Sequence, residues 1–285
     1  MKKIIPRLLI FFIGIPLVIF LIVFLPQKNH LAANIVIVIC TALGAVEFAG
    51  VLKQKKMIIP VWEAAVLGAL APLAALLAVS FGFDYWSISG FLMAGAFWIL
   101  VSRIFSAEKK FDDFAGRAAA GFSVMLYPGL FMAWIIRMTR WPHADLVILI
   151  FILTICINDS AAWAAGMLFG KGNRGIIPAS PNKSIAGFIG GFIISLLAGA
   201  AAVSFFPEAF TSTRLPSLAA GMILTFLAGL AGTLGDLGES VLKRSAGIKD
   251  SGSLIPGRGG MLDTIDSIAL AAPVYFGVYW FLFSR

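Results

Sequence analysis

The chain has 285 residues, of which 60% are hydrophobic and 13% are charged, and its formal net charge is +8. Soluble globular domains carry about 25% charged residues, so this composition excludes a soluble enzyme or binding module and predicts an integral membrane protein. The excess of Lys and Arg is interpreted as a topology signal, with some capacity for anionic lipid or nucleotide, and we expect no nucleic-acid partner.

Apolar runs follow one another along the whole chain, and a membrane span needs roughly 20 such residues. We predict nine spans, at residues 8–25, 31–52, 59–81, 86–105, 117–137, 146–169, 185–206, 215–238 and 262–282. The fold class is therefore all-α and polytopic. We expect one membrane domain, with about four N-terminal spans in residues 1–116 and about five spans of a catalytic region in residues 117–285.

The distribution of basic residues predicts the orientation in the membrane. With the N-terminus in the cytoplasm, most of the 22 Lys and Arg residues fall on the cytoplasmic side. The other side keeps Lys28, Arg137, Arg140, Arg214 and Arg285. This orientation places the polar loops 170–184 and 243–261 in the cytoplasm, where nucleoside triphosphates are found. We expect a bacterial-type inner membrane protein with a polar catalytic cavity open to the cytoplasm.

Asp159 lies near the middle of the predicted span 146–169. An acid at membrane depth indicates a functional cavity, although a structural hydrogen bond to a neighbouring helix is the alternative. Lys183 and Ser184 stand at the start of the next span, where a phosphate can meet backbone N–H groups. The alternative for this segment is a connector whose lysine only sets topology.

Asp236, Glu239, Ser240 and Lys243 follow i, i+3, i+4, i+7 spacing at the end of the eighth span, so they share one helical face. Asp236 lies about two turns inside the charged end, where an acid is costly unless it faces a cavity or a partner. A helix end with solvated charges is the alternative.

The loop after this span contains Lys249, Asp250, Gly259 and Gly260. Glycine-rich loops that lead into a helix N-terminus are natural phosphate cradles. Asp263 and Asp266 follow in the first turn of the last span. Helix capping explains one such acid, whereas two on one face favour a Mg²⁺ site.

Two further acids, Glu47 and Glu63, lie in the second and third predicted spans. Each is either a cavity-lining group or a paired structural acid.

Two motifs resemble the phosphatidate cytidylyltransferase family, the CDP-diacylglycerol synthases. The signature S-x-hydrophobic-K-R, K-D, and a glycine turn leading to D-x-x-D spans residues 240–266. Its matching positions are Ser240, Leu242, Lys243, Arg244, Lys249, Asp250, Pro256, Gly259, Gly260, Asp263 and Asp266. A second motif matches at Asp159, Ala162, Gly166, Phe169, Gly170, Lys171, Ser180, Pro181, Lys183 and Ser184.

Three positions depart from the family pattern. The family usually has His at position 258, Arg at 264 and Glu at 186, whereas this chain has Arg258, Thr264 and Ala186. Arg258 keeps a cation but cannot shuttle a proton near neutral pH. Because the carboxylates and most lysines of the pattern remain, we expect a working enzyme with altered loop chemistry rather than an inactive one.

The resemblance implies transfer of CMP from CTP to phosphatidic acid at a Mg²⁺ centre, with a second, monovalent cation as an option, in a homodimer embedded in the lipid bilayer. The expected catalytic residues are Asp236, Lys243, Lys249, Asp250 and Asp263, and the expected metal ligands are Asp236, Asp263 and Asp266. The expected substrate-binding residues are Asp159, Lys183, Ser184, Ser240, Arg244, Arg258, Gly259 and Gly260.

Three alternatives stay open on the sequence. They are a related lipid nucleotidyltransferase or polyprenol kinase with another lipid substrate, a catalytically weakened homologue, and a transporter or channel. The transporter is disfavoured because the charge is concentrated on one predicted face and no internal repeat is found.

Overall fold

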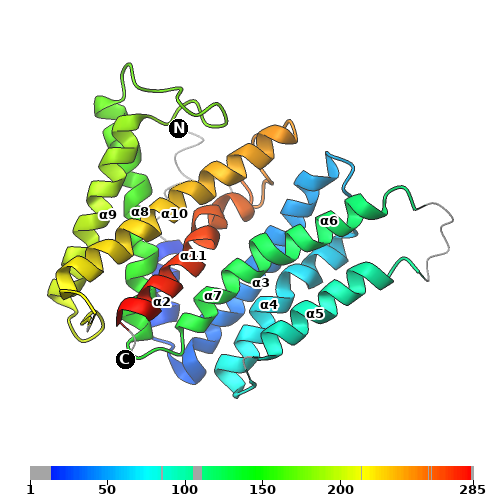
Figure 1. The fold of residues 1–285 in the computed structure, drawn as a ribbon, viewed down its shortest axis with the longest axis horizontal. Coiled ribbons are helices and arrows are strands. Elements are labelled where there is room, and N and C mark those ends of the chain that lie inside the picture. The colour runs from blue at the N-terminus through cyan, green and yellow to red at the C-terminus, as the bar shows by residue number, and fades with distance from the viewer. Residues whose placement is uncertain are drawn as a thin grey trace. The chain divides into compact units, whose positions relative to one another are not determined.

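The computed structural model describes residues 14–84, 86–104, 111–212, 214–255, 257 and 259–283. These residues form helices and loops, and within the same ranges the only β-pairings are isolated bridges. The predicted all-α fold class is confirmed (Figure 1). The helices are α2 (Ile15–Val23), α3 (Gln27–Lys53), α4 (Val61–Phe81), α5 (Trp86–Val101), α6 (Phe114–Val124), η2 (Met125–Leu130), α7 (Phe131–Met138), α8 (Ala144–Phe169), α9 (Ile185–Phe205), α10 (Ser217–Ser245) and α11 (Leu262–Phe283).

Seven helical segments of the described chain are long and apolar enough to cross a membrane, against nine predicted spans. The first predicted span is described only in part, since residues 8–13 lie outside the described residues and α2 has 9 residues. The fourth gives α5, whose 16 residues are short for a full span. The chain turns after Val101, where Arg103 forms an ion pair with Asp113 at 2.7 Å.

The predicted start at residue 31 is close to where α3 becomes regular. Lys28, Asn29 and His30 all have positive φ angles, so regular helical geometry begins at Leu31.

The fifth predicted span contains a π-helix, η2, between α6 and α7. Pro128 lies inside η2. A proline has no N–H to donate and its ring crowds the carbonyl four residues earlier, so a widened turn lets the helix continue through it.

The chain divides into two compact units, which are described separately. The first unit comprises Met1–Arg140 and Leu242–Ile265, and the second comprises Trp141–Val241 and Asp266–Arg285. Both α10 and α11 therefore contribute residues to each unit. The predicted division at residue 116 stays a prediction.

The first unit has its core between α3, α4 and the α6–η2 segment. Phe48, Leu67 and Val124 are buried there together with Leu262 of α11. Small residues let the backbones approach: a Cβ on Gly68 of α4 would lie 2.3 Å from the Cβ of Ala45 in α3.

The second unit packs α8, α9, α10 and α11. Helices α8 and α9 lie side by side (Figure 1). At the crossing of α9 and α10, a Cβ on Gly199 would lie 2.1 Å from the carbonyl oxygen of Gly221. The buried Tyr275 of α11 donates a hydrogen bond to the carbonyl of Val147 in α8, at 3.0 Å. This packing fixes the three helices that carry the pocket described below.

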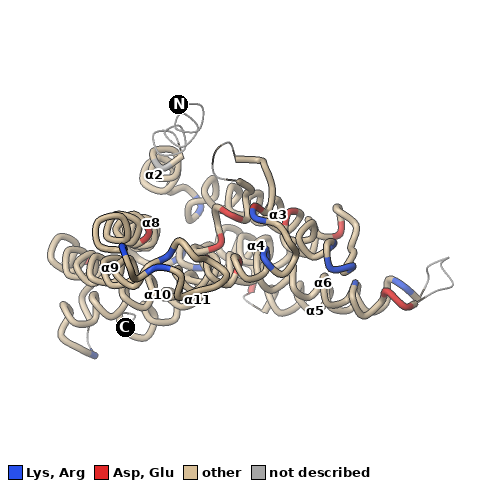
Figure 2. Tube along the Cα trace, turned by 90° about the horizontal axis from the view of Figure 1, so that it is seen from above, with Lys and Arg blue, Asp and Glu red and all other residues tan. Residues whose placement is uncertain are grey.

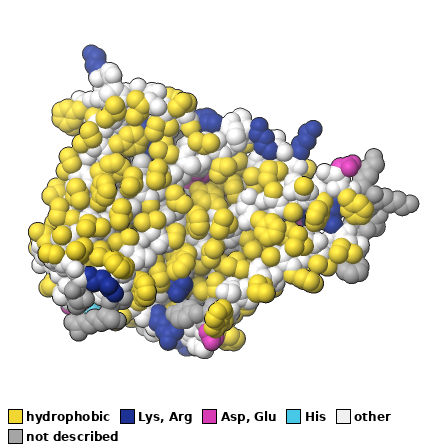
Figure 3. All heavy atoms as spheres, viewed as in Figure 1, with side chains coloured by type: hydrophobic (Ala, Val, Ile, Leu, Met, Phe, Trp, Pro, Cys, Tyr) yellow, Lys and Arg dark blue, Asp and Glu magenta, His cyan; other side chains and the backbone are white. Residues whose placement is uncertain are grey.

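The surface is largely hydrophobic. Most of the trace in Figure 2 is neither Lys, Arg, Asp nor Glu. Hydrophobic side chains cover most of the face shown in Figure 3, and Trp86, Leu168 and Phe205 are each more than 70% exposed. Exposed apolar area on this scale is costly in water and fits a lipid environment.

Candidate functional site

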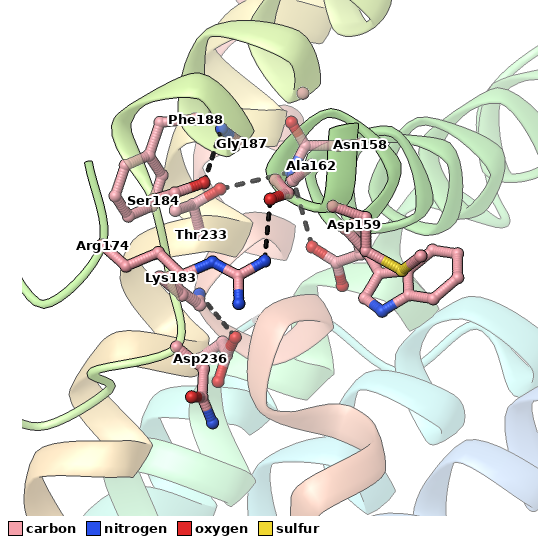
Figure 4. Close-up of a pocket in the computed structure, with 15 residues that line it drawn as sticks. Asn158, Asp159, Ala162, Arg174, Lys183, Ser184, Gly187, Phe188, Thr233 and Asp236 are labelled. Carbon is pink, nitrogen blue, oxygen red and sulfur yellow. Dashed lines mark hydrogen bonds and ion pairs between the residues drawn. The ribbon is translucent and has the colours of Figure 1, made fainter. Parts of the chain in front are cut away.

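A pocket of about 530 Å³ opens in the second unit between α8, the loop 170–184, α9 and α10 (Figure 4). The predicted residues Asp159, Lys183, Ser184 and Asp236 all line it. Four residues predicted from three separate segments are thus brought to one cavity.

The loop 170–184 is held against α8 by hydrogen bonds near Gly166. The guanidinium of Arg174 donates to the carbonyl oxygen of Gly166 at 2.8 Å. Ser184 is the N-cap of α9, and its side chain accepts from the backbone N–H of Gly187 at 3.0 Å. A serine in this position satisfies one of the unpaired donors at a helix start. The loop therefore presents its cations at a fixed edge of the pocket.

Lys183 and Asp236 both line the pocket and point toward each other (Figure 4). The Nζ of Lys183 lies 2.6 Å from Oδ2 of Asp236, and the two side chains are 25% and 33% exposed. Both charges are accessible to a ligand, and each partner neutralises the other until a ligand competes for it.

Asn158 organises the floor of the pocket. Its buried amide donates to Oγ1 of Thr233 at 3.2 Å and to Oδ1 of Asp159 at 3.4 Å. Its Oδ1 accepts from the hydroxyl of Ser195 at 3.1 Å. The network joins α8, α9 and α10, so the Asp159 carboxylate is supported by a rigid base.

The second group of predicted residues lies in the first unit and centres on Asp263. Lys243 forms an ion pair with Oδ1 of Asp263. Oδ2 accepts from the backbone N–H groups of Ser251 at 2.9 Å and Gly260 at 2.7 Å, and from the Ser251 hydroxyl at 2.8 Å. Asp263 therefore ties together both ends of the signature loop 246–261.

Glu47 of α3 also belongs to this group. The sequence left open whether Glu47 lines a cavity or is a paired structural acid. Its Oε2 accepts from the backbone N–H of Leu262 at 2.8 Å and from the hydroxyl of Ser251 at 3.2 Å. The only signal in the sequence was a carboxylate inside an apolar run, because its partners lie more than 200 residues away.

Glu63 is a paired structural acid. It forms an ion pair with Arg117 and accepts from Nε1 of Trp98 at 3.1 Å, which links α4, α5 and α6. Its side chain is only 2% exposed.

The other predicted site residues are placed as follows. Arg244, Lys249 and Asp250 are exposed, and Ser240 is half-buried in α10. Asp266 is buried, and its Oδ1 accepts from the backbone N–H of Ser267. Arg258 lies outside the described residues.

Two of the three positions that depart from the family pattern are described. Thr264 donates from its hydroxyl to the carbonyl of Gly260 at 3.1 Å, within the first turn of α11. The backbone N–H of Ala186 donates to Oδ1 of Asn173 at 3.5 Å. Neither side chain carries the charge that the family usually has there.

Arg174 lines the pocket but was interpreted from the sequence only as a topology signal. Arg174 lies between Asp159 and Lys183 in the chain, in the loop that also carries Lys183, and this position was the indication of its role in the sequence.

Among the described residues, no group of three or more His, Cys, Asp or Glu side chains is placed to hold a metal ion by itself. The pocket does offer oxygen donors of the kind that Mg²⁺ prefers, in the carboxylates of Asp159 and Asp236. Mg²⁺ usually takes only one or two protein carboxylates and completes its shell with water and phosphate oxygens. The donor set of the pocket therefore fits this ion.

A model of the cytidylyltransferase family matches residues 5–282 of this chain. A phosphatidate cytidylyltransferase of Haemophilus influenzae is 36% identical over 159 residues, which are 53% of this chain and 54% of that protein. A phosphatidate cytidylyltransferase of Pseudomonas aeruginosa is 33% identical over 154 residues, with the same two shares. An uncharacterized protein of Escherichia coli, YnbB, is 36% identical over 149 residues, 50% of this chain and 46% of that protein. The chain thus spans about half the length of the curated relatives it matches.

Proposed function

Because this chain belongs to the cytidylyltransferase family, we propose that it transfers CMP from CTP to phosphatidate and forms CDP-diacylglycerol and pyrophosphate. The observation that carries the proposal is the pocket, which is lined by the cations of Lys183 and Arg174 and by the carboxylates of Asp159 and Asp236. Cations that bind phosphates and carboxylates that suit a divalent metal are the two requirements of nucleotidyl transfer.

The reaction needs little acid–base chemistry. An oxygen of the phosphatidate phosphate, already an anion, forms a bond to the α-phosphorus of CTP. The bond from that phosphorus to the bridging oxygen of the β-phosphate breaks, and its electron pair leaves with pyrophosphate. The barrier comes from bringing two anions together and from charge on the transferred group. Positioning and electrostatic stabilisation are therefore the main contributions expected of the protein.

Lys183 and Arg174 are proposed to hold the triphosphate at the pocket edge, with Ser184 and the start of α9 beside it. The Lys243–Asp263 pair fixes one end of the signature loop, whose exposed Lys249 is proposed to bind phosphate. Arg244 and Arg258 are proposed to act in the same way. A guanidinium suits a phosphate because it donates two parallel hydrogen bonds.

Asp236 is proposed to hold Mg²⁺ in the pocket, with Asp159 as a further ligand or orienting group. Asp263 and Asp266 as metal ligands, and Asp250 as an orienting group, stay predictions. When bound, Mg²⁺ supplies positive charge to the phosphate oxygens. The second cation and the homodimer expected from the resemblance stay predictions.

The site is proposed to face the cytoplasm, where CTP is found, with the diacyl chains of phosphatidate remaining in the bilayer. The charge bias of the loops supports this orientation. The apolar surface of the helices supports the membrane location.

The test is release of pyrophosphate from CTP by the purified protein in mixed micelles, with and without phosphatidate, across a Mg²⁺ titration. Release that needs both phosphatidate and Mg²⁺ is the expected result. A parallel panel replaces CTP with ATP and phosphatidate with other phospholipids or polyprenols. Turnover of a member of that panel, with none for phosphatidate, would contradict the proposed substrate and favour the related lipid enzymes.

A further inference from the structure

Glu47 reaches the signature loop from α3, an element outside both recognised motifs. We propose that Glu47 is a positioning residue of this enzyme, which holds Ser251 and Leu262, the two ends of the segment 251–262, against α3 and so sets the orientation of Asp263. The inference rests on the proposed function for its catalytic consequence, whereas the contact itself is independent of any substrate.

The hydrogen bonds of Glu47 fall at both ends of the segment. Oε2 accepts from the hydroxyl of Ser251, which begins the segment 251–262. It also accepts from the N–H of Leu262, which ends the segment and is the first residue of α11. The early N–H groups of a helix have no partner within the helix, so a carboxylate from another helix serves as their cap. One side chain of α3 therefore joins the loop to the start of α11.

Ser251 connects Glu47 with Asp263. Its hydroxyl lies 3.2 Å from Oε2 of Glu47 and 2.8 Å from Oδ2 of Asp263. A hydroxyl carries a single proton and donates to one acceptor at a time, so the two carboxylates share one donor. Movement of Glu47 changes the hydrogen bonding of Asp263 directly.

The glycines of the loop leave room for these carboxylates. A Cβ on Gly252 would lie 2.4 Å from Oε1 of Glu47, and one on Gly260 would lie 2.1 Å from its Oε2. A Cβ on Gly259, where φ is +114°, would lie 2.5 Å from Oδ2 of Asp263. The glycine pattern, predicted as a phosphate cradle, also has this second explanation in packing.

Packing of α3 against the first turn of α11 supports the same contact. One turn before Glu47, a Cβ on Gly44 would lie 2.9 Å from Cδ1 of Ile265 in the first turn of α11. Helix α3 is thus placed against the residues that Glu47 caps, and the contact does not depend on one flexible side chain alone.

The first test exploits Gly252, because the three atoms nearest to its added Cβ, apart from its chain neighbours, all belong to Glu47. Gly252→Ala forces the carboxylate away and breaks its hydrogen bonds, whereas Glu47→Ala removes the obstruction. The rate of pyrophosphate release should fall about tenfold in each single variant. In the Glu47→Ala background, Gly252→Ala should reduce that rate further by less than about twofold. Gly259→Ala is the matched control, since its positive φ keeps it strained in both backgrounds.

The second test separates positioning from plain stability. Glu47→Ala should lower kcat about tenfold and change the KM for CTP less than about threefold. Glu47→Gln keeps an acceptor oxygen for Leu262 and Ser251, so it should restore kcat to within about threefold of the unsubstituted protein. An unchanged kcat in folded Glu47→Ala protein would overturn the proposal.

The third test needs no substrate. Trypsin cleavage after the exposed Lys249 should be about tenfold faster in Glu47→Ala, while cleavage after Lys171, in the second unit, should keep its rate. Equal rates of cleavage at Lys249 in the unsubstituted protein and in Glu47→Ala would overturn the contact. So would an equal drop in melting temperature caused by Gly252→Ala in those two proteins. Faster cleavage in a protein that does not act on phosphatidate would leave the contact standing and contradict only the proposed substrate.

Discussion

Asp236 and Asp263 are both predicted metal ligands, yet their surroundings differ. Asp236 forms an ion pair with Lys183 and is 33% exposed, whereas Asp263 is 7% exposed and accepts from Lys243, Ser251 and Gly260. The first carboxylate is available to a ligand, and the second is also part of the loop's own structure.

Replacing each aspartate with asparagine should separate these roles. Asp236→Asn should reduce turnover about 100-fold or more and leave the melting temperature nearly unchanged, because partly exposed ion pairs contribute about 1 kcal/mol or less. Asp263→Asn should also reduce turnover, and should cost about 2–3 kcal/mol of stability, because the amide loses the charge that pairs with Lys243 and one of the two acceptor oxygens. Pyrophosphate release and thermal unfolding in detergent measure both effects. Near-normal turnover in both variants would contradict the metal assignment.

Local spacing predicted some of these residues and not their partners. Asp159 and Asp236 were chosen as acids inside apolar runs, and Lys183 and Ser184 from their position at a helix start. The structure places all four in one pocket. The Lys183–Asp236 pair could not be predicted, because it joins a loop to a helix two elements later. The contact of Glu47 with Leu262 spans 215 residues and leaves no trace in local sequence.

Glu63 links three helices of the first unit at a buried point. Its pairing with Arg117 and Trp98 connects α4, α6 and α5. Removing one member of a buried ion pair leaves the other charge uncompensated, whereas removing both relieves that cost.

Glu63→Leu should therefore destabilise the protein by about 3 kcal/mol, and Glu63→Leu with Arg117→Leu should cost less than the single change. Trp98→Phe is the control for the remaining hydrogen bond, worth about 1 kcal/mol. Thermal unfolding in detergent measures all three variants. A double variant less stable than Glu63→Leu would contradict a compensated ion pair.

The crossing of α9 and α10 depends on two glycines. Because a Cβ on Gly199 would lie 2.1 Å from the Gly221 carbonyl, Gly199→Ala should lower the melting temperature by several degrees, roughly 2–4 °C per kcal/mol. Gly277→Ala in α11 meets nothing within 4 Å and should be neutral or slightly stabilising. Equal melting temperatures for both variants would show that the helices separate without cost.

Helix positions were the most predictable feature, because a long apolar run determines a span by length alone. The fourth predicted span ended too late, since the helix stops at Val101 and residues 102–104 form a turn. The π-helix at Pro128 was not predicted, because the hydrophobic pattern of the run does not record a change in hydrogen-bond register.

At the scale of the whole molecule, the charge bias makes a prediction about sidedness. In a background of Cys40→Ala and Cys156→Ser, Lys171→Cys and Lys249→Cys should react with a membrane-impermeant maleimide only from the cytoplasmic side. Arg214→Cys, on the opposite predicted side, should react from outside in the same vesicles. All three positions are exposed. Labelling of Lys171→Cys from outside would reverse the predicted orientation.

The ion pair between Lys183 and Asp236 should make the binding of an anion and the binding of a divalent cation depend on each other. An anion that binds Lys183 releases Asp236, and a divalent cation that binds Asp236 releases Lys183. When both ligands bind, the free-energy cost of breaking the 2.6 Å ion pair arises only once. Each ligand should therefore tighten the other by the same factor, as linkage requires. Titration calorimetry on the protein would register this reciprocity as a nucleotide affinity that rises with the concentration of the cation, and Lys183→Met should weaken the dependence.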